Sequence, residues 1–117
     1  MIETKEILQT AYKALDEKQG EDIVVLDIAD ISVIADYFII TNGNSDAQIS
    51  ALIDSVDEEM GKKNISIKQQ EGNAKGDWVL LDYGDVIIHI FNKDSRMFYN
   101  LERIWSDAKR LDNQKIG

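Results

Sequence analysis

Carboxylates are the side chains of this sequence that offer the most chemistry, with 22 Asp and Glu among 117 residues. Metal-dependent nucleotidyl transfer needs a Gly-Ser start and an Asp-x-Asp pair on the next strand, which hold two magnesium ions over a triphosphate. Residues 43–45 read Gly-Asn-Ser, and the chain contains no Asp-x-Asp. Residues 57–59 come nearest, but they fall in a predicted helix and are typical of a solvated face. The scattered acids Asp27, Asp36 and Asp82 leave a divergent magnesium-dependent nucleotidyltransferase as the alternative to a non-enzyme.

Other catalytic or metal-binding groups are few. There is no cysteine, which excludes disulfides, thiolate metal sites and a cysteine nucleophile. His89 is the single histidine, and no local motif supplies it with a serine or cysteine partner. A solitary histidine in a strand is more often packed or hydrogen-bonded than catalytic. We therefore expect no catalytic residue, no metal and no cofactor.

The segment at residues 41–45 joins a predicted strand to a predicted helix, where free amides and the helix dipole could hold an anion. Its one glycine is far short of a dinucleotide fingerprint or a P-loop. A tight strand-to-helix connection is the favoured interpretation.

The charge balance indicates the kind of partner. Lys and Arg total 13, which gives a net charge of −9. Affinity for nucleic acid depends mainly on cations that neutralise phosphates, so we expect little direct RNA binding. An acidic chain is steered toward basic partners such as a basic protein. Solubility alone is the alternative explanation of the acidity, and charge does not separate the two.

The N-terminus lacks the basic start and long apolar stretch of a signal peptide. No apolar run approaches the length of a membrane span. We expect a soluble cytoplasmic protein that does not bind membranes.

Hydrophobic periodicity predicts the elements of the first half. Residues up to about 18 form an amphipathic helix with Gly20 as a plausible stop. Residues 23–26 suit a strand buried in the middle of a sheet, and residues 37–41 a second strand. Ser45 and Gln48 form a capping box that begins a second helix, which continues to about residue 63.

The second half predicts more strands and a last helix. Residues 65–68 alternate as in a short strand, and residues 78–83 and 86–91 face each other across a turn at residues 84–85. Asp94 or Ser95 can cap a last helix. Its apolar residues are Phe98, Leu101, Trp105 and Ala108. This order predicts an α/β fold, a layered mixed β-sheet with flanking helices, in a single domain over residues 1–108 with a polar C-terminal tail over residues 109–117.

The hairpin has two different faces. If residues 84–85 form its turn, Leu81 pairs with Ile88 and Val79 with Ile90, and this nearly all-apolar face belongs to the core. The opposite face gathers Trp78, Leu80, Asp82, Ile87, His89 and Phe91. An aromatic anchor among polar groups is common at protein interfaces. The alternative is that a helix covers this face too.

Four stretches resemble hallmark sequences of the Iojap family of ribosomal silencing factors. They are residues 26–28 (LDI), 32–40 (SVIADYFII), 77–91 (DWVLLDYGDVIIHIF) and 99–105 (YNLERIW). The match covers the chain from the first helix to about Trp105. One departure is Gly-Asn-Ser at residues 43–45, where the family usually has Gly-Thr-Ser.

The resemblance implies a nucleotidyltransferase-like fold without the catalytic acids, and a function in translation rather than catalysis. It implies binding to the large ribosomal subunit through ribosomal protein L fourteen, at the surface that otherwise meets the small subunit. The bound factor would sterically block subunit association and so repress translation. The family's tryptophan-containing strand maps onto Trp78. The resemblance makes Trp78, Leu80, Asp82, His89 and Tyr99 the candidate partner contacts, and a homodimer is plausible on the same ground.

A third class remains beside the silencing factor and the nucleotidyltransferase, namely an antitoxin-like acidic protein that binds a small basic one. The identity of a captured partner would separate it from a silencing factor, and nucleotide turnover with magnesium would reveal an enzyme.

Overall fold

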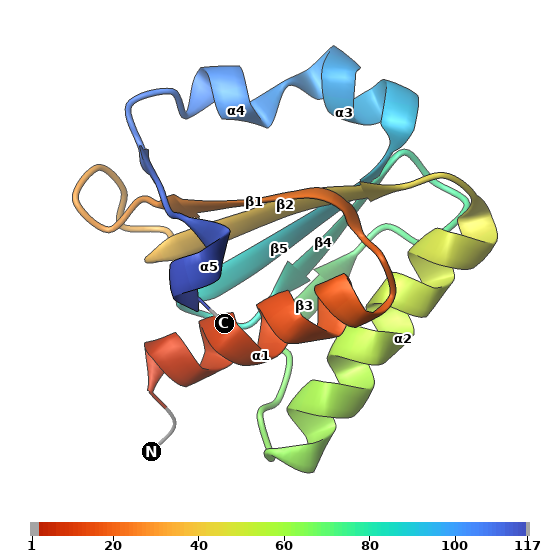
Figure 1. Cartoon of the computed structure of the whole chain (residues 1–117), viewed down its shortest axis with the longest axis horizontal. Helices are drawn as coiled ribbons and strands as arrows, with labels where there is room; N and C mark the ends of the chain where they lie inside the picture. The colour runs from red at the N-terminus through yellow and green to blue at the C-terminus, as the bar shows by residue number, and fades with distance from the viewer. Residues whose placement is uncertain (1–2, 117) are drawn as a thin grey trace.

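The computed structural model describes residues 3–116 as a layered α/β fold around one mixed sheet (Figure 1). The elements in chain order are α1 (Thr4–Glu17), β1 (Glu21–Asp27), β2 (Tyr37–Gly43), α2 (Asp46–Lys62), β3 (Gln69–Glu71), β4 (Trp78–Asp82), β5 (Val86–Asn92), α3 (Lys93–Tyr99), α4 (Leu101–Ile104), β6 (Lys109–Arg110) and α5 (Asn113–Ile116). The six-stranded sheet has the order β3-β4-β5-β2-β1-β6. Strands β2 and β5 run parallel, and the other neighbours are antiparallel. The predicted fold class is confirmed.

Helices α1 and α2 cover one face of the sheet. Ser45 caps α2 as predicted, because its Oγ accepts the amide of Gln48 at 3.1 Å. The chain leaves α1 through Gln19, which takes the left-handed conformation, and the Gly20 amide closes the helix on the Leu15 carbonyl at 2.9 Å. Gly20 is needed for space, since a Cβ there would lie 2.9 Å from Thr41 Oγ1.

Helices α3 and α4 lie over the opposite face, where a second apolar cluster forms. Leu101 and Trp105 pack there against side chains of β1, β2 and β5. The run at residues 23–26 is therefore buried on both faces, as its composition predicts. It does not lie in the middle of the sheet, because only the two-residue strand β6 lies beyond β1.

The hairpin has the predicted register. Leu81 pairs with Ile88 and Val79 with Ile90, and both pairs contribute to the core under α1 and α2. Gly84 makes the turn possible because its φ of +91° favours glycine.

Two local predictions were wrong. Residues 65–68 form no strand: the Ile65 amide closes α2 on the Met60 carbonyl and its side chain enters the core, and pairing with β4 begins only at Gln69. The single last helix is instead two short helices, because Asn100 adopts the left-handed conformation between them (φ 46°). The cap of α3 is Asn92, whose Oδ1 accepts the Ser95 amide at 2.9 Å.

Residues 109–116, expected to form a polar tail, join the fold. Strand β6 pairs with β1, and the Leu111 amide donates to the Val25 carbonyl at 2.9 Å. Ile116 is buried in the core under α1. The sequence concealed this docking because the stretch contains just two apolar residues, Leu111 and Ile116, with four polar residues between them.

Candidate functional site

Trp78 opens β4 and is held on three sides. Its Nε1 donates a hydrogen bond to His89 Nδ1 at 3.1 Å, and its ring centroid lies 5.0 Å from those of Phe91 and Tyr99. Asn92 fixes the start of the strand, because its amide donates to the Asp77 carbonyl and its Nδ2 to Asp77 Oδ1 at 3.2 Å. The indole remains half-buried.

His89 lies beneath this tryptophan rather than on the surface. It is 4% exposed and packs edge-on against Phe38, with ring centroids 4.6 Å apart. Burial lowers its pKa to about 4, so the ring is neutral at pH 7. Since Nδ1 accepts the Trp78 hydrogen, the proton is on Nε2, which has no partner within the described structure. His89 therefore presents almost no surface of its own, and its contact with the exposed part of the face is the hydrogen bond to Trp78. That it takes part in partner binding stays a prediction.

The other two candidates on β4 are also half-buried. Leu80 packs at the edge of the cluster beneath α3 and α4. Asp82 accepts the Gly84 amide at 2.7 Å and so shapes the hairpin turn. The helices therefore cover β5 on this face, as the alternative interpretation expected, but leave β4 partly open.

Tyr99 comes from α3 and completes the aromatic group above β4. It is 38% exposed, and its ring is 6.0 Å from that of Phe91 as well as 5.0 Å from that of Trp78. We call Trp78, Leu80 and Tyr99 the aromatic surface. Phe98, expected to face the core, is 82% exposed beside it. Sequence reasoning missed this exposure because the turn at Asn100 shifts the helical phase.

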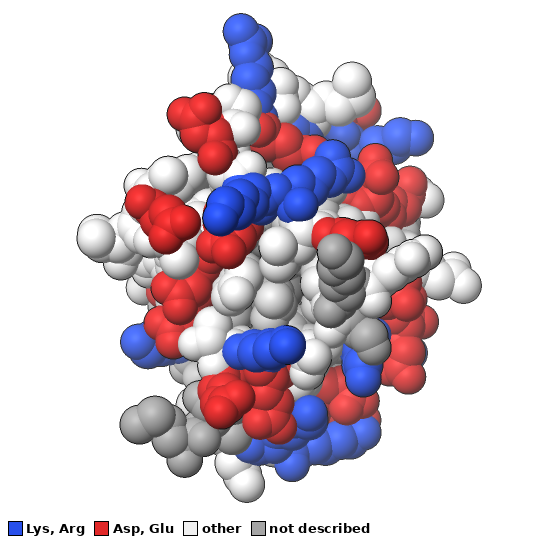
Figure 2. Space-filling model, turned by 60° about the vertical axis from the view of Figure 1, so that its left-hand side comes forward, with Lys and Arg blue, Asp and Glu red and all other residues white. Residues whose placement is uncertain are grey.

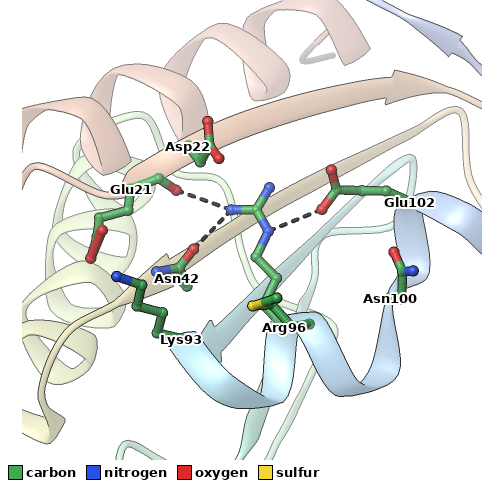
Figure 3. A pocket seen from close by; sticks show the side chains of 8 residues that line it. Glu21, Asp22, Asn42, Lys93, Arg96, Asn100 and Glu102 are labelled. Carbon is green, nitrogen blue, oxygen red and sulfur yellow. Dashed lines mark hydrogen bonds and ion pairs between the residues drawn. The ribbon is translucent and has the colours of Figure 1, made fainter.

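A cavity of about 480 Å³ opens where β2 ends and α3 begins. Arg96, itself buried, crosses it: Nε pairs with Glu102 at 3.0 Å, and Nη1 donates to Asn42 Oδ1 at 2.9 Å and to the Glu21 carbonyl at 3.2 Å (Figure 3). These bonds tie α3 and α4 to the sheet. No local motif marked Arg96 in the sequence.

The candidate acids Asp27 and Asp36 flank the loop between β1 and β2, and the pKa of Tyr37 is raised by burial and by both of these nearby carboxylates. Asp27 accepts the Ala29 amide in its own loop, and Asp82 lies at the hairpin turn. Over residues 3–116, no group of three or more His, Asp or Glu side chains could hold a metal ion. Figure 2 shows acidic and basic side chains interspersed on one side of the molecule.

None of the helices in the described part of the chain is both long enough and apolar enough to cross a membrane.

The fold and this surface define a class of small α/β proteins in which helices cover one sheet face only in part and leave a group of aromatic side chains there. Comparison with known proteins gives the family: the profile described as "Ribosomal silencing factor during starvation" matches residues 1–117. The chain belongs to this family of ribosomal silencing factors, whose role is regulatory rather than catalytic.

Individual relatives agree with this assignment. The chain is 45% identical over 108 residues to ribosomal silencing factor RsfS of Bacillus subtilis, covering 92% of each chain. It is 40% identical over 101 residues to the chloroplastic protein Iojap of Zea mays, covering 86% of this chain and 43% of that one. A crystal structure of a Chromobacterium violaceum protein superposes with a TM-score of 0.85 at 33% identity, covering 90% of this chain and 88% of that one.

Proposed function

We propose that this protein binds the large ribosomal subunit through ribosomal protein L fourteen and sterically blocks association with the small subunit, which represses translation in the cytoplasm. The observation that carries the proposal is the half-buried Trp78, whose indole donates a hydrogen bond to His89 and whose ring contacts that of Tyr99. Family membership supports the ribosomal part of the proposal.

The geometry of the aromatic surface suits a protein anchor. Binding energy at interfaces concentrates in aromatic side chains seated near the centre of the contact. The hydrogen bond to His89 and the ring contacts with Phe91 and Tyr99 fix the indole before a partner arrives, so less conformational entropy is lost on binding. The net charge of −9 favours encounter with a basic ribosomal protein over contact with RNA.

Co-sedimentation tests the proposal. Purified protein is mixed with separated large and small subunits and run on a density gradient, and a pull-down with purified ribosomal protein L fourteen is run in parallel. We expect the protein with large subunits alone, and we expect the Trp78→Ala variant to remain at the top of the gradient. Migration with small subunits, or with neither, would overturn the proposal. The sedimentation of the free protein tests whether it forms the homodimer that the family resemblance suggests.

A further inference from the structure

The loop between β1 and β2, residues 28–36, presents apolar side chains to solvent. Ile31 is 48% exposed, Val33 104% and Ile34 61%. We call these three residues the β1–β2 tip. In Figure 1 the loop, coloured orange, projects beyond the end of the sheet. Apolar side chains gathered on one exposed loop, unlike the single ones that any surface carries, mark a site of interaction.

Hydrogen bonds hold this loop in one shape. The Ile28 amide closes its base by donating to the Asp36 carbonyl at 2.9 Å, and both Ile28 and Ala35 are buried. The Ser32 amide donates to the Ile28 carbonyl at 2.9 Å, and the Ser32 Oγ accepts the Ile34 amide at 3.1 Å. These bonds fix the backbone of the tip, so the tip loses little conformational entropy when it binds.

Carboxylates surround the tip and indicate a basic partner. The loop and the last residue of β1 carry three aspartates and no Lys or Arg. The hairpin turn adds Asp85, whose carbonyl accepts the Asp36 amide at 2.8 Å. Lys109 lies 3.9 Å from Asp30 in a largely exposed pair, and Lys68 lies beside the turn, so carboxylates remain in excess. Such a surface repels nucleic acid and attracts a positively charged protein.

The tip and Trp78 lie at opposite ends of the sheet. The loop leads into Tyr37, which pairs with Val86 at the start of β5, whereas Trp78 pairs with Phe91 near the end of this strand. The stretch of β5 between these two pairs spans about 17 Å. The tip is therefore a surface separate from the aromatic surface.

We propose that the β1–β2 tip is a second contact with the large ribosomal subunit, in which Val33 and Ile34 insert into an apolar recess of a basic ribosomal protein other than the one bound at Trp78. This inference rests on the proposed function. A second contact strengthens attachment to the whole subunit, because binding at one site raises the effective concentration at the other. It leaves the affinity for the first protein alone unchanged.

Two binding assays separate these contacts. Wild type, the double variant Val33→Ser/Ile34→Ser and the variant Ile67→Ser are each titrated with purified large subunits and with purified ribosomal protein L fourteen. Ile67 is a matched control, because it is an exposed apolar residue outside the loop. We expect the double variant to bind ribosomal protein L fourteen like wild type and large subunits about tenfold more weakly. Thermal unfolding should match wild type, since the changed side chains lie on the surface.

Photo-crosslinking identifies what the tip touches. A photoreactive phenylalanine analogue replaces Val33 in one preparation and Lys18, which is exposed just after α1, in a control preparation. Each is mixed with purified large subunits and irradiated. We expect the analogue at Val33 to crosslink to a basic ribosomal protein other than L fourteen, and the analogue at Lys18 to give no such product.

The outcomes distinguish this inference from the proposed function. Equal binding of the double variant and wild type to large subunits would overturn the inference and leave the proposed function intact. So would a crosslink from Val33 to ribosomal RNA, to ribosomal protein L fourteen or to a second copy of this chain. An equal loss in Ile67→Ser would also overturn it, because the effect would not be specific to the tip. If wild type binds no large subunits, the proposed function fails and the inference fails with it.

Discussion

The two faces of the sheet differ in how completely helices cover them. Under α1 and α2, Val79 and Leu81 of β4 are buried, as are their partners on β5. On the other face, α3 and α4 bury the residues of β5 but leave Trp78 and Leu80 of β4 half-buried. The first face therefore stabilises the fold, and the second leaves part of β4 uncovered by the helices.

Leu81 and Leu80 test most directly whether the two faces differ, because they are the same residue type, adjacent in the sequence and on opposite faces of β4. We expect Leu81→Ala to cost about 3–4 kcal/mol of unfolding free energy, as a core truncation does, while the remaining folded protein binds its partner normally. Leu80→Ala should cost roughly 1 kcal/mol of stability and weaken partner binding more than Leu81→Ala does. Urea unfolding and a binding assay on the same preparations measure both, and equal stability losses would show that the faces do not differ.

Trp78→Ala should damage binding more than folding. We expect a loss of about 2–4 kcal/mol in binding free energy, and a loss of stability well below the roughly 3–5 kcal/mol of a core tryptophan. Thermal unfolding and a pull-down on ribosomal protein L fourteen separate the two effects. A variant that melts far earlier than wild type, while its folded fraction binds normally, would place Trp78 in the core.

His89 links stability to pH through its burial. Its pKa is lowered to about 4 in the fold against 6.5 in the unfolded chain, so the unfolded state binds more protons between these values. The stability from this group is complete above pH 6.5 and falls as the pH drops, by roughly 2 kcal/mol at pH 5. In His89→Leu this part of the loss should vanish. Urea unfolding at pH 7 and pH 5 measures the difference, and equal slopes for both proteins would contradict the burial effect.

The same variant tests the support of Trp78. His89→Leu removes the acceptor of the Trp78 indole N–H, and the lost hydrogen bond should lower the free energy of unfolding by about 1 kcal/mol. We expect weaker partner binding at pH 7, although His89 itself does not reach the surface.

Sequence patterns correctly predicted the features that depend on neighbouring residues, such as turns and strand alternation. The turn at Gly84 fixes the hairpin register, so strand alternation assigned Val79 and Leu81 to the core correctly. The periodicity that indicated one last helix could not show the break at Asn100, since asparagine is tolerated inside helices and also takes the left-handed conformation at their ends. With this break, Phe98 is exposed while Arg96 bonds to the sheet. Whether α3 and α4 cover β5, β4 or both depends on tertiary packing, which is why the sequence left His89 as a surface candidate.

The smallest expected effect comes from the charge of Asp82. Asparagine keeps an Oδ1 that can accept the Gly84 amide, so Asp82→Asn should retain the hairpin turn and lose only the negative charge. If this charge faces a basic partner, affinity should fall by about 0.5–1 kcal/mol at low salt, and the difference should disappear at high salt. Titration of binding at two salt concentrations measures this.

The variant also tests the enzyme alternative: because the chain lacks paired acids, we expect no magnesium-dependent nucleotide turnover from wild type or variant. Turnover in wild type that Asp82→Asn abolishes would restore a catalytic role, and the half-open face would then be a substrate site rather than a docking surface.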